Sequence, residues 1–420
     1  MKLSKLQLVL VIAITFLGGY FFGVNKVNFE LRHYVPQISI VNKEPPAGVS
    51  TVDFSLFWSV WDKIVTGYYD KSAVNPQKML YGAISGMVAS LNDPYTMFLP
   101  PTQQTNFQQQ LAGQFTGIGA ELGLKNQQII VIAPLTGSPA EKAGIKAGDA
   151  ILKVDGQSTS SWTLPQAVDK IRGPKGTTVV LTIAHKDASA STDITITRDV
   201  ITVKSVDGWI KPIASIDGIS DTLKNSSQKD NSVVYVRLSQ FGDNTDQDWS
   251  NLVASLLPKI KSQNPKGMIL DLRNNPGGYL TDAVFIAGEF LPQGTSVVIQ
   301  DTGTDKTTLS VNRDGNLMTI PLVILINKGS ASASEIVSGS MRDNGRAKLI
   351  GDTSFGKGTV QQALDLGNSS GLHVTIAKWL TPKGTWVHGK GLTPDVSVAL
   401  DEKDPSHDSQ LEAAIQELLK

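Results

Sequence analysis

The sequence predicts an α/β (α+β) protein in which a membrane helix, a helical segment and a β-rich module precede an α/β core. Apolar runs at positions 233–238, 267–272, 321–326 and 373–379 alternate with helical stretches, which is typical of such a core. Short β segments with glycine turns fill 115–185, and helical periodicity dominates 53–91. We therefore expect six parts: an anchor (1–25), a tether (26–52), a helical region (53–112), a β-rich domain (113–186), an α/β core (187–400) and a tail helix (401–420).

Composition excludes several classes of site. The 420 residues carry 38 Lys and Arg against 38 Asp and Glu, and this zero net charge argues against nucleic-acid binding. Cysteine is absent, which excludes a cysteine nucleophile, disulfides and thiolate-bound metal. The five histidines are scattered with no two at i, i+4, so we expect neither a metal nor another cofactor.

The first element is an uncharged run, Leu6–Val24, which follows Lys2 and Lys5. Its 19 residues suffice to span a bilayer as a helix, and aromatic residues close it where a membrane interface would hold them. We expect an uncleaved single-pass anchor, with a cleaved signal peptide and a buried helix as the alternatives. The positive charges on the two sides of the run differ little, so they do not decide how the helix is oriented in the membrane. The soluble bulk of the chain follows this span, and we place it outside the cytoplasm of a bacterial cell.

Two segments follow the anchor. Residues 26–52 contain three prolines and no sustained period, as in a tether. The stretch Asp53–Leu91 has helical periodicity, and Asn75-Pro76 is expected to divide it into two helices. Apolar residues from Phe54 to Val65 recur at i, i+3, i+4 and i+7. We interpret them as a packing face, with a partner-binding face as the alternative; this region and the tail helix are candidate surfaces of a homodimer.

The β-rich module opens with glycines ahead of a short alternating strand. Such a turn exposes consecutive N–H groups that suit a peptide's terminal carboxylate, while the peptide adds a strand to the sheet edge. Together with Gly137–Ile145, Lys146–Leu152 and Val154-Asp155-Gly156, this pattern resembles a PDZ domain over roughly residues 113–185. Plain glycine turns are the alternative. The resemblance implies that a C-terminal peptide binds Gly117, Ile118, Gly119, Leu122 and Leu124.

The apolar strand at 321–326 leads into a stretch of small residues that ends in Ser332-Ala333-Ser334-Glu335. Small residues let a substrate backbone approach, and a serine at a helix N-terminus meets the positive end of the helix dipole. Plain helix capping, with Glu335 in the first turn, is the alternative. A serine nucleophile needs a base, and no histidine lies in a triad setting. Lys357, between two glycines, is the better candidate because desolvation lowers the pKa of a lysine.

The lysine segment is also a near match to a phosphate-binding loop. Gly351, Gly356 and Lys357 fit that pattern. Gly358, however, stands where the loop requires the Ser or Thr that holds magnesium, and no clear helix follows. Nucleotide binding is therefore disfavoured.

The serine and lysine motifs, Gly329–Ile336 and Ser354–Gln361, together resemble the carboxy-terminal processing (tail-specific) proteases. These serine peptidases carry a PDZ domain ahead of the catalytic core, and the resemblance covers roughly Asp53–Leu419. It implies that Ser332 is the nucleophile, that Lys357, 25 positions on, is its base, and that Gln361 orients the lysine.

The same resemblance implies an oxyanion hole made by backbone N–H groups. We assign Gly278, with Gly277 close behind, and Ala333. Pro276 replaces a glycine that is common in the family and has no N–H to donate. In the resembling proteases an arginine at the place of Arg172 can link the docked PDZ domain to the core; a solvated surface arginine is the alternative.

The expected protein is thus a membrane-anchored serine endopeptidase. It captures proteins with exposed apolar C-termini and hydrolyses peptide bonds with a Ser–Lys dyad. A non-catalytic PDZ adaptor that binds peptide tails is the main alternative, and a P-loop ATPase is the third.

Overall fold

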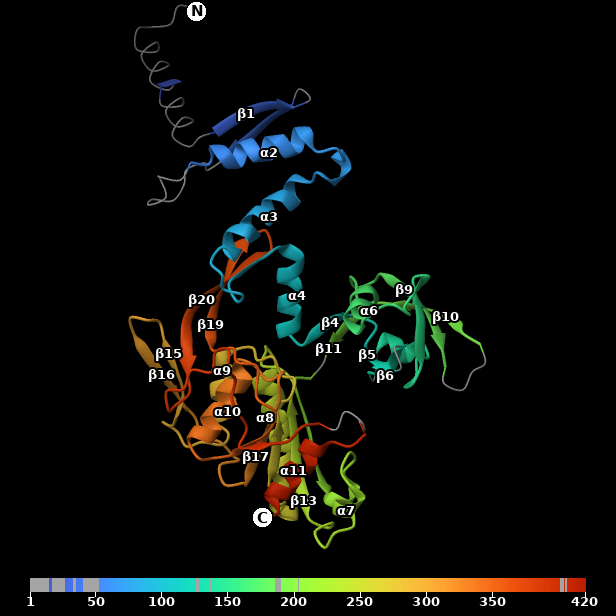
Figure 1. Ribbon diagram of the computed structural model, residues 1–420, viewed down its shortest axis with the longest axis vertical. Helices are drawn as coiled ribbons and strands as arrows, with labels where there is room; N and C mark the ends of the chain where they lie inside the picture. The colour runs from blue at the N-terminus through green and yellow to red at the C-terminus, as the bar shows by residue number, and fades with distance from the viewer. Residues whose placement is uncertain are drawn as a thin grey trace, which may run out of the picture. The chain divides into compact units, whose positions relative to one another are not determined.

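A computed structural model describes residues 15–16, 27–32, 35–40, 53–125, 128–135, 137–185, 190–202, 204–400, 404 and 406–420. Apart from residues 15–16, the apolar run Leu6–Val24 lies outside these ranges. Within them, no helix combines the length and the apolar character that crossing a bilayer requires. The chain divides into two compact units, Met1–Leu80 and Tyr81–Lys420 (Figure 1).

The first unit contains a hairpin where the sequence predicts a tether. Strands β1 (Val27–Arg32) and β2 (Val35–Ile40) pair antiparallel. The physical reason is alternation: apolar residues occupy every second position of β1, which suits a pleated strand despite the nearby prolines.

Helix α2 (Ser55–Gly67) follows, then a short 3-10 turn η1 (Lys71–Ala73) and helix α3 (Pro76–Ala89), which continues into the second unit. Two helices are present as predicted, and the interruption between them runs from Tyr68 to Asn75, so that it ends at the predicted Asn75-Pro76. Pro76 is the first residue of α3, where its missing N–H costs nothing. None of the α2 side chains is buried by the described residues, and Trp58 is 60% exposed. The predicted packing face therefore has no partner in the part of the chain that the structure describes.

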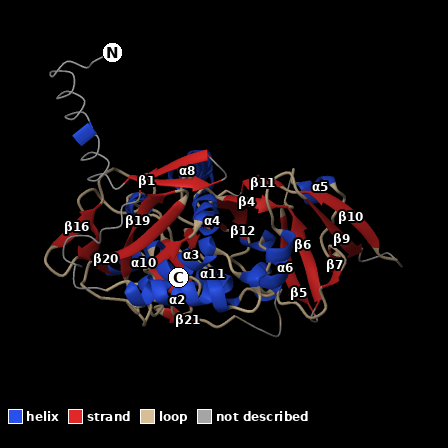
Figure 2. Ribbon diagram, turned by 90° about the horizontal axis from the view of Figure 1, so that it is seen from above, coloured by secondary structure: helices blue, strands red, loops and turns tan. Residues whose placement is uncertain are grey.

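The second unit begins with the end of α3, strand β3 (Met97–Leu99), helix α4 (Pro101–Leu111) and strand β4 (Gln114–Gly117). The PDZ-like module then forms a sheet in the order β10-β9-β7-β6-β5, and Figure 2 shows these strands gathered with helices α5 and α6. Its elements are β5 (Ala120–Lys125), β6 (Gln128–Pro134), α5 (Pro139–Lys142), β7 (Ala150–Val154), β8 (Gln157–Ser158), α6 (Leu164–Ile171), β9 (Thr178–Ala184) and β10 (Thr192–Thr197). Strand β11 (Asp199–Thr202) returns to pair with β4.

Buried Arg198, which lies between β10 and β11, connects the end of this module to helix α6. Its guanidinium donates to the carbonyl oxygens of Ile171 and Thr178 at 2.7 and 2.6 Å. Because Ile171 ends α6, the arginine satisfies a carbonyl that the helix leaves unpaired.

The α/β core is built on a six-stranded sheet in the order β12-β13-β14-β17-β18-β21. From β13 to β21 neighbouring strands are parallel, and β12 is antiparallel at one edge. The strands are β12 (Val206–Pro212), β13 (Ser232–Leu238), β14 (Met268–Asp271), β17 (Leu322–Ile326), β18 (Lys348–Gly351) and β21 (Val396–Ser397). Every residue of β14 and β17 is buried, which is why β17 reads as an uninterrupted apolar run and why β14 is apolar up to its last residue, Asp271.

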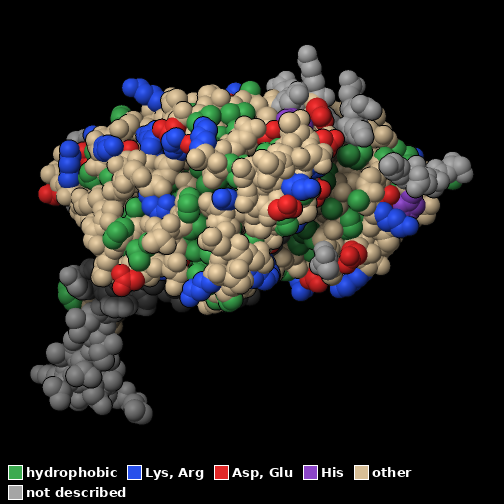
Figure 3. Space-filling model, turned by 90° about the horizontal axis from the view of Figure 1, so that it is seen from below, with side chains coloured by type: hydrophobic (Ala, Val, Ile, Leu, Met, Phe, Trp, Pro, Cys, Tyr) green, Lys and Arg blue, Asp and Glu red, His purple; other side chains and the backbone are tan. Residues whose placement is uncertain are grey.

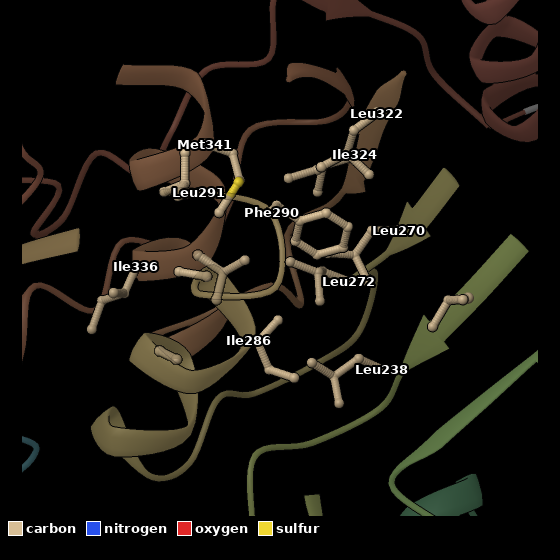
Figure 4. Close-up of a cluster of buried hydrophobic side chains, with 14 of the residues drawn as sticks. Leu238, Leu270, Leu272, Ile286, Phe290, Leu291, Leu322, Ile324, Ile336 and Met341 are labelled. Atoms are coloured by element: carbon tan, nitrogen blue, oxygen red, sulfur yellow. The ribbon is translucent and has the colours of Figure 1, made fainter. Parts of the chain in front are cut away.

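Helices cover both faces of this sheet. On one face lie α8 (Thr245–Gln263), α9 (Leu280–Ala287) and α10 (Ala333–Asp343), whose apolar side chains meet those of β13, β14 and β17. Figure 4 shows this cluster, with Phe290 beside Leu270 and Ile324. On the other face lies the tail helix α11 (Ser409–Leu418), within the range 401–420 that the sequence predicts for it.

The polar residues 225–229 predict an exposed loop over 214–231, but this segment also packs on the α11 face. It overlaps the turn η2 (Ile213–Ser215) and contains the short helix α7 (Asp221–Lys224), and Ile216, Ile219 and Leu223 are buried there. The loop prediction was wrong for these three residues. The polar run at 225–229 indicates a loop, whereas the three apolar residues lie in turns that are too short for a hydrophobic period to be recognised.

A second sheet, in the order β16-β15-β20-β19 with β3 added to β20, flanks the core. Its remaining strands are β15 (Ser296–Asp301), β16 (Lys306–Ser310), β19 (Thr359–Gly367) and β20 (Ser370–Leu380). On the face drawn in Figure 3, positive and negative side chains are interspersed, in keeping with the zero net charge.

Candidate active site

Three loops leave the carboxyl ends of neighbouring parallel strands β14, β17 and β18, at one edge of the core sheet. They carry the glycine motif, the serine motif and the lysine motif. Ligand sites of open α/β sheets form at this edge. The topology therefore brings together three motifs that lie 25 to about 80 positions apart in the sequence.

Ser332 occupies a strained turn at the start of α10. Its backbone has φ 55° and ψ −115°, a conformation that residues with a side chain rarely adopt. The residue is half-buried, and the N–H of Ala333, the first residue of the helix, has no acceptor among the described residues. A strained serine with a free N–H behind it is typical of a nucleophile turn.

The buried carboxylate of Glu335 joins the serine turn to the lysine loop. Its Oε2 accepts the N–H of Ser332 at 2.8 Å and the N–H of Lys357 at 2.9 Å. Its Oε1 accepts the N–H of Gly356 at 2.7 Å and the hydroxyl of Ser354 at 2.5 Å. The sequence predicts Glu335 only as a helix-capping residue. The cap is present, but its bonds to Ser354, Gly356 and Lys357 cross about 20 positions and have no signature in the local sequence.

Lys357 lies beside this turn with its side chain half-buried. Burial lowers the pKa of Lys357, against the opposing charges of Asp93 and Glu335. Its Nζ lies 5.2 Å from the centre of the Tyr95 ring, in a cation–π contact. Among the described residues, no hydrogen bond joins the Lys357 amine to the Ser332 hydroxyl. The backbones are thus adjacent, while the two reactive groups are not engaged.

Gln361 is on β19, four residues after the lysine. Its Nε2 donates to the hydroxyl oxygens of Thr359 at 2.9 Å and of Thr375 at 3.1 Å. A strand follows the Gly351–Lys357 segment, whereas a phosphate-binding loop opens a helix.

The glycine loop distinguishes the two candidate oxyanion donors. The N–H of Gly277 donates to Asn275 Oδ1 at 2.9 Å and is therefore occupied. The N–H of Gly278 has no acceptor among the described residues. At Gly277, an added Cβ would lie 2.8 Å from Ser332 Cβ, so this glycine lets the loop approach the serine. Gly278 has φ 142° and a Cβ there would lie 1.6 Å from Phe241 O, so only glycine fits.

Asn275, a second residue that sequence analysis missed, holds this loop against the serine turn. It is fully buried and donates to Leu238 O at 2.7 Å. Its own carbonyl accepts the N–H of Ala331 at 3.0 Å and the hydroxyl of Ser334 at 2.9 Å. The oxyanion loop and the nucleophile turn are therefore one hydrogen-bonded unit.

Arg273 ties the start of the glycine loop to the tail. Its guanidinium forms paired contacts with Asp271 and, at 2.8 Å, with Asp408 at the start of α11. Burial alone would lower the pKa of Arg273, but hydrogen bonds and charge pairing with these two carboxylates raise it. The C-terminal helix thus braces the strand end from which the loop departs.

The residues predicted to bind a peptide lie on strand β5 and in the turn before it, and the region between β5 and helix α6 is called the groove below. Strand β5 is the edge of its sheet and contacts α6. The turn Gly117-Ile118-Gly119 precedes β5, and Gly119 has φ 74°. Ile118 is 3% exposed and belongs to the module's core, against which Leu122 packs. The side chain of Leu124 lies outside the described part of the chain.

Arg172 lies at the C-terminal end of α6, beside strand β4. It is exposed, caps α6, and its guanidinium carbon lies 5.1 Å from the centre of the Phe115 ring. Its Cγ is also the nearest atom to a Cβ added at Gly117, at 3.8 Å. Arg172 therefore lies between the glycine turn and strand β4, which enters the module.

Comparison with known proteins adds three family matches. The model of peptidase family S41 matches residues 232–398, that of the PDZ domain matches 104–184, and that of the activating protease CtpB N-terminal domain matches 14–102. The S41 match contains all three motif loops, and the PDZ match contains the groove.

Whole-chain relatives agree with these matches. Carboxy-terminal processing protease CtpA of Bacillus subtilis (strain 168) is 33% identical over 373 residues, covering 89% of this chain and 74% of CtpA. CtpB of the same organism is 32% identical over 410 residues, covering 96% of this chain and 78% of CtpB. A putative S41 protease from Bacteroides fragilis NCTC 9343 shares the fold, with a TM-score of 0.57 at 16% identity over 83% of this chain and 91% of that chain. The chain thus belongs to peptidase family S41 and is a serine-type carboxy-terminal processing protease with a PDZ domain.

Proposed function

We propose that this protease cleaves peptide bonds with a dyad of Ser332 and Lys357. The observation that carries the proposal is the shared oxygen of Glu335, which accepts the backbone N–H groups of both residues. Because this oxygen holds the two backbones together, we expect a rotation of the lysine side chain away from Tyr95 to bring the amine to the serine hydroxyl. Burial supports the chemistry, because it lowers the pKa of Lys357 and so favours the neutral amine that a base requires.

In the proposed reaction, the neutral Lys357 amine takes the proton of the Ser332 hydroxyl as the oxygen attacks the scissile carbonyl. The N–H groups of Gly278 and Ala333 stabilise the oxyanion. The C–N bond then breaks, the ammonium returns the proton to the leaving amine, and an acyl-enzyme remains. A water that gives its proton to Lys357 attacks the ester carbonyl; the bond from the acyl carbon to the Ser332 oxygen then breaks, and the Lys357 ammonium returns the proton to that oxygen. Gln361 holds the strand beside the lysine in place.

Cleavage of a tagged peptide with an apolar C-terminus, followed by mass spectrometry, tests the dyad. Ser332→Ala and Lys357→Ala are each expected to abolish cleavage while tail binding persists. Ser338→Ala is the matched control: it lies on the same helix, and its buried hydroxyl has no hydrogen-bond partner among the described residues. Undiminished cleavage by Ser332→Ala would exclude the dyad.

We also propose that the groove between β5 and α6 captures the C-terminus of the substrate. The free edge of β5 and the glycine turn ahead of it support this role. Leu122→Asp is expected to weaken tail binding more than cleavage of unfolded casein. Ile132→Asp, the same change at a half-exposed position of neighbouring β6, serves as the control. Equal tail affinity in the two variants would remove Leu122 from the groove.

For the first unit we propose a membrane anchor at Leu6–Val24, with the catalytic part outside the cytoplasm of a bacterial cell. The uncharged length of this run supports the anchor. Resistance of the full chain to alkaline extraction from membranes, together with an intact N-terminal mass, is the expected result. Release into the soluble fraction or a truncated N-terminus would exclude an uncleaved anchor.

We propose further that the exposed aromatic face of α2 pairs with a second copy of the chain. Phe54 and Trp58 are 51% and 60% exposed, and contiguous apolar faces of this kind mark association sites. Light scattering of the full chain in detergent is expected to give a dimer, and Trp58→Ser to shift it toward monomer. A wild-type monomer would refute this pairing.

A further inference from the structure

The segment Asp93–Thr96 lies outside the ranges matched by the S41 and PDZ models, yet it packs against the lysine. Its position is fixed by β3, which directly follows and pairs antiparallel with β20, so that Met97 lies opposite His373. Tyr95 is separated from Lys357 by more than 260 positions in the sequence. Only the tertiary fold brings the two together.

The segment is internally rigid. Asp93 accepts the backbone N–H of Tyr95 at 3.0 Å and the hydroxyl of Thr96 at 2.7 Å. These bonds close a tight turn that presents the Tyr95 ring toward the lysine. The ring is itself held edge-on by His388, with centroids 5.9 Å apart, and His388 stacks on Trp386 at 5.1 Å.

A chain of hydrogen bonds continues from this turn to Gln361. Thr96 is buried, and its Oγ1 accepts the backbone N–H of Thr375 at 3.0 Å. The hydroxyl oxygen of Thr375 in turn accepts from Gln361 Nε2 at 3.1 Å. One short segment therefore contacts the proposed base through Tyr95 and reaches its partner glutamine through Thr96.

We propose that Asp93–Thr96 is a positioning element of the catalytic centre: the Tyr95 ring holds the Lys357 ammonium away from Ser332 in the resting enzyme, and the Thr96–Thr375 chain fixes Gln361. This inference rests on the proposed Ser–Lys dyad. It assigns part of the region matched by the CtpB N-terminal model to the chemistry itself.

The charges around Lys357 predict the direction in which its pKa changes when this segment is altered. The charged and titratable groups facing Lys357 are Asp93 and Tyr95 on this segment, Glu335 on α10, His373 on β20 and His388 near Trp386. Burial lowers the pKa of Lys357, while the charges of Asp93 and Glu335 raise it. The ring of Tyr95 also favours the ammonium. Removing either Asp93 or the ring, with bulk retained, should lower the pH at which Lys357 loses its proton.

The first experiment titrates Lys357 directly, without reliance on cleavage. The full chain is labelled with acetic anhydride at graded pH, and the rate of Lys357 acetylation is followed by mass spectrometry. Tyr95→Leu and Asp93→Asn are expected to move the midpoint down by about one pH unit. Tyr95→Phe, which keeps a ring, should match the wild type, as should Tyr69→Leu, the same change at a tyrosine that is 91% exposed. An unchanged or raised midpoint in both Tyr95→Leu and Asp93→Asn overturns the proposal.

The second experiment tests the link to Gln361. Thr96→Val removes the hydroxyl at constant shape and is expected to lower kcat about tenfold with KM unchanged, whereas Thr96→Ser should restore it. Equal kcat for the two variants overturns this part of the proposal. Failure of the dyad is distinguishable from failure of this proposal. If the dyad is wrong, Ser332→Ala still cleaves the peptide, while the labelling midpoints at Lys357 still shift in Tyr95→Leu and Asp93→Asn.

Discussion

Asp282→Asn is expected to change the pH dependence of stability more than any single substitution outside the motif loops. Asp282 lies in the first turn of α9, four positions after Gly278 of the oxyanion loop, and is only 7% exposed. Its Oδ2 has no hydrogen-bond partner among the described residues. Burial, with added repulsion from Asp246 and Asp243, raises the pKa of Asp282 from 3.8 to about 7.

The sign follows from proton binding. Between pH 3.8 and about 7 the folded protein keeps the proton of Asp282 while the unfolded chain has lost it, so stability falls as pH rises through this window. A difference of roughly 3 pH units, at 1.36 kcal/mol each, amounts to about 4 kcal/mol above pH 7. Asparagine cannot ionise. Its unpaired amide donor costs about 1–3 kcal/mol, but equally at every pH.

Urea unfolding of the Ser332→Ala protein at pH 4.5, 6 and 8, with and without Asp282→Asn, is the assay. Tryptophan fluorescence reports on this core because Trp249 and Trp379 are fully buried in it. The advantage of the asparagine variant should grow by several kcal/mol from pH 4.5 to pH 8. Asp217→Asn, at an exposed carboxylate, should show no such growth. A pH-independent difference for Asp282→Asn would refute the reasoning.

Three further substitutions probe the site itself. Lys357→Met should abolish cleavage yet raise the melting temperature at pH 7, because burial lowers the pKa of Lys357 and so penalises its charge. This gain in melting temperature should shrink as the pH approaches 10.5, and thermal melts at pH 7 and pH 10 would show the difference. Glu335→Gln leaves one acceptor oxygen for four donors and is expected to lower kcat/KM by about 100-fold in the peptide assay; a near-normal kcat/KM would contradict the joining role of Glu335. Gly278→Ala forces a Cβ against Phe241 O and should destabilise the protein by more than Gly137→Ala, a positive-φ glycine with open space, when the two are compared by urea unfolding; equal losses would show that φ alone matters.

Much of the core was predictable because its signals are local. The uninterrupted apolar run at 321–326 indicates burial on both faces, and the structure pairs it in parallel with the apolar strand predicted at 267–272. The resemblance to the tail-specific proteases supplied Gly277 and Gly278, and the structure adds the physical reason: a Cβ at either position would clash with neighbouring atoms. Segment 214–231 was missed because Ile216 and Ile219 lie in turns that are too short for a period to emerge.

The parts of the site that escaped prediction depend on distance in the sequence. Glu335 has a local signature as a helix cap, but its bonds to Gly356 and Lys357 exist only once two loops meet. Tyr95 has no local signature beyond the end of a helix. For α2 the pattern shows that an apolar face exists, whereas periodicity carries no information about what covers it.

The four hydrogen bonds of Glu335 have a consequence for the speed of activation. They tie the main chain of the serine turn to that of the lysine loop, so we expect the proposed engagement of Lys357 with Ser332 to proceed by rotation about side-chain bonds. Such rotations take nanoseconds to microseconds, orders of magnitude faster than loop refolding. An enzyme arranged in this way can be silent between encounters and still respond within the lifetime of a single weak complex.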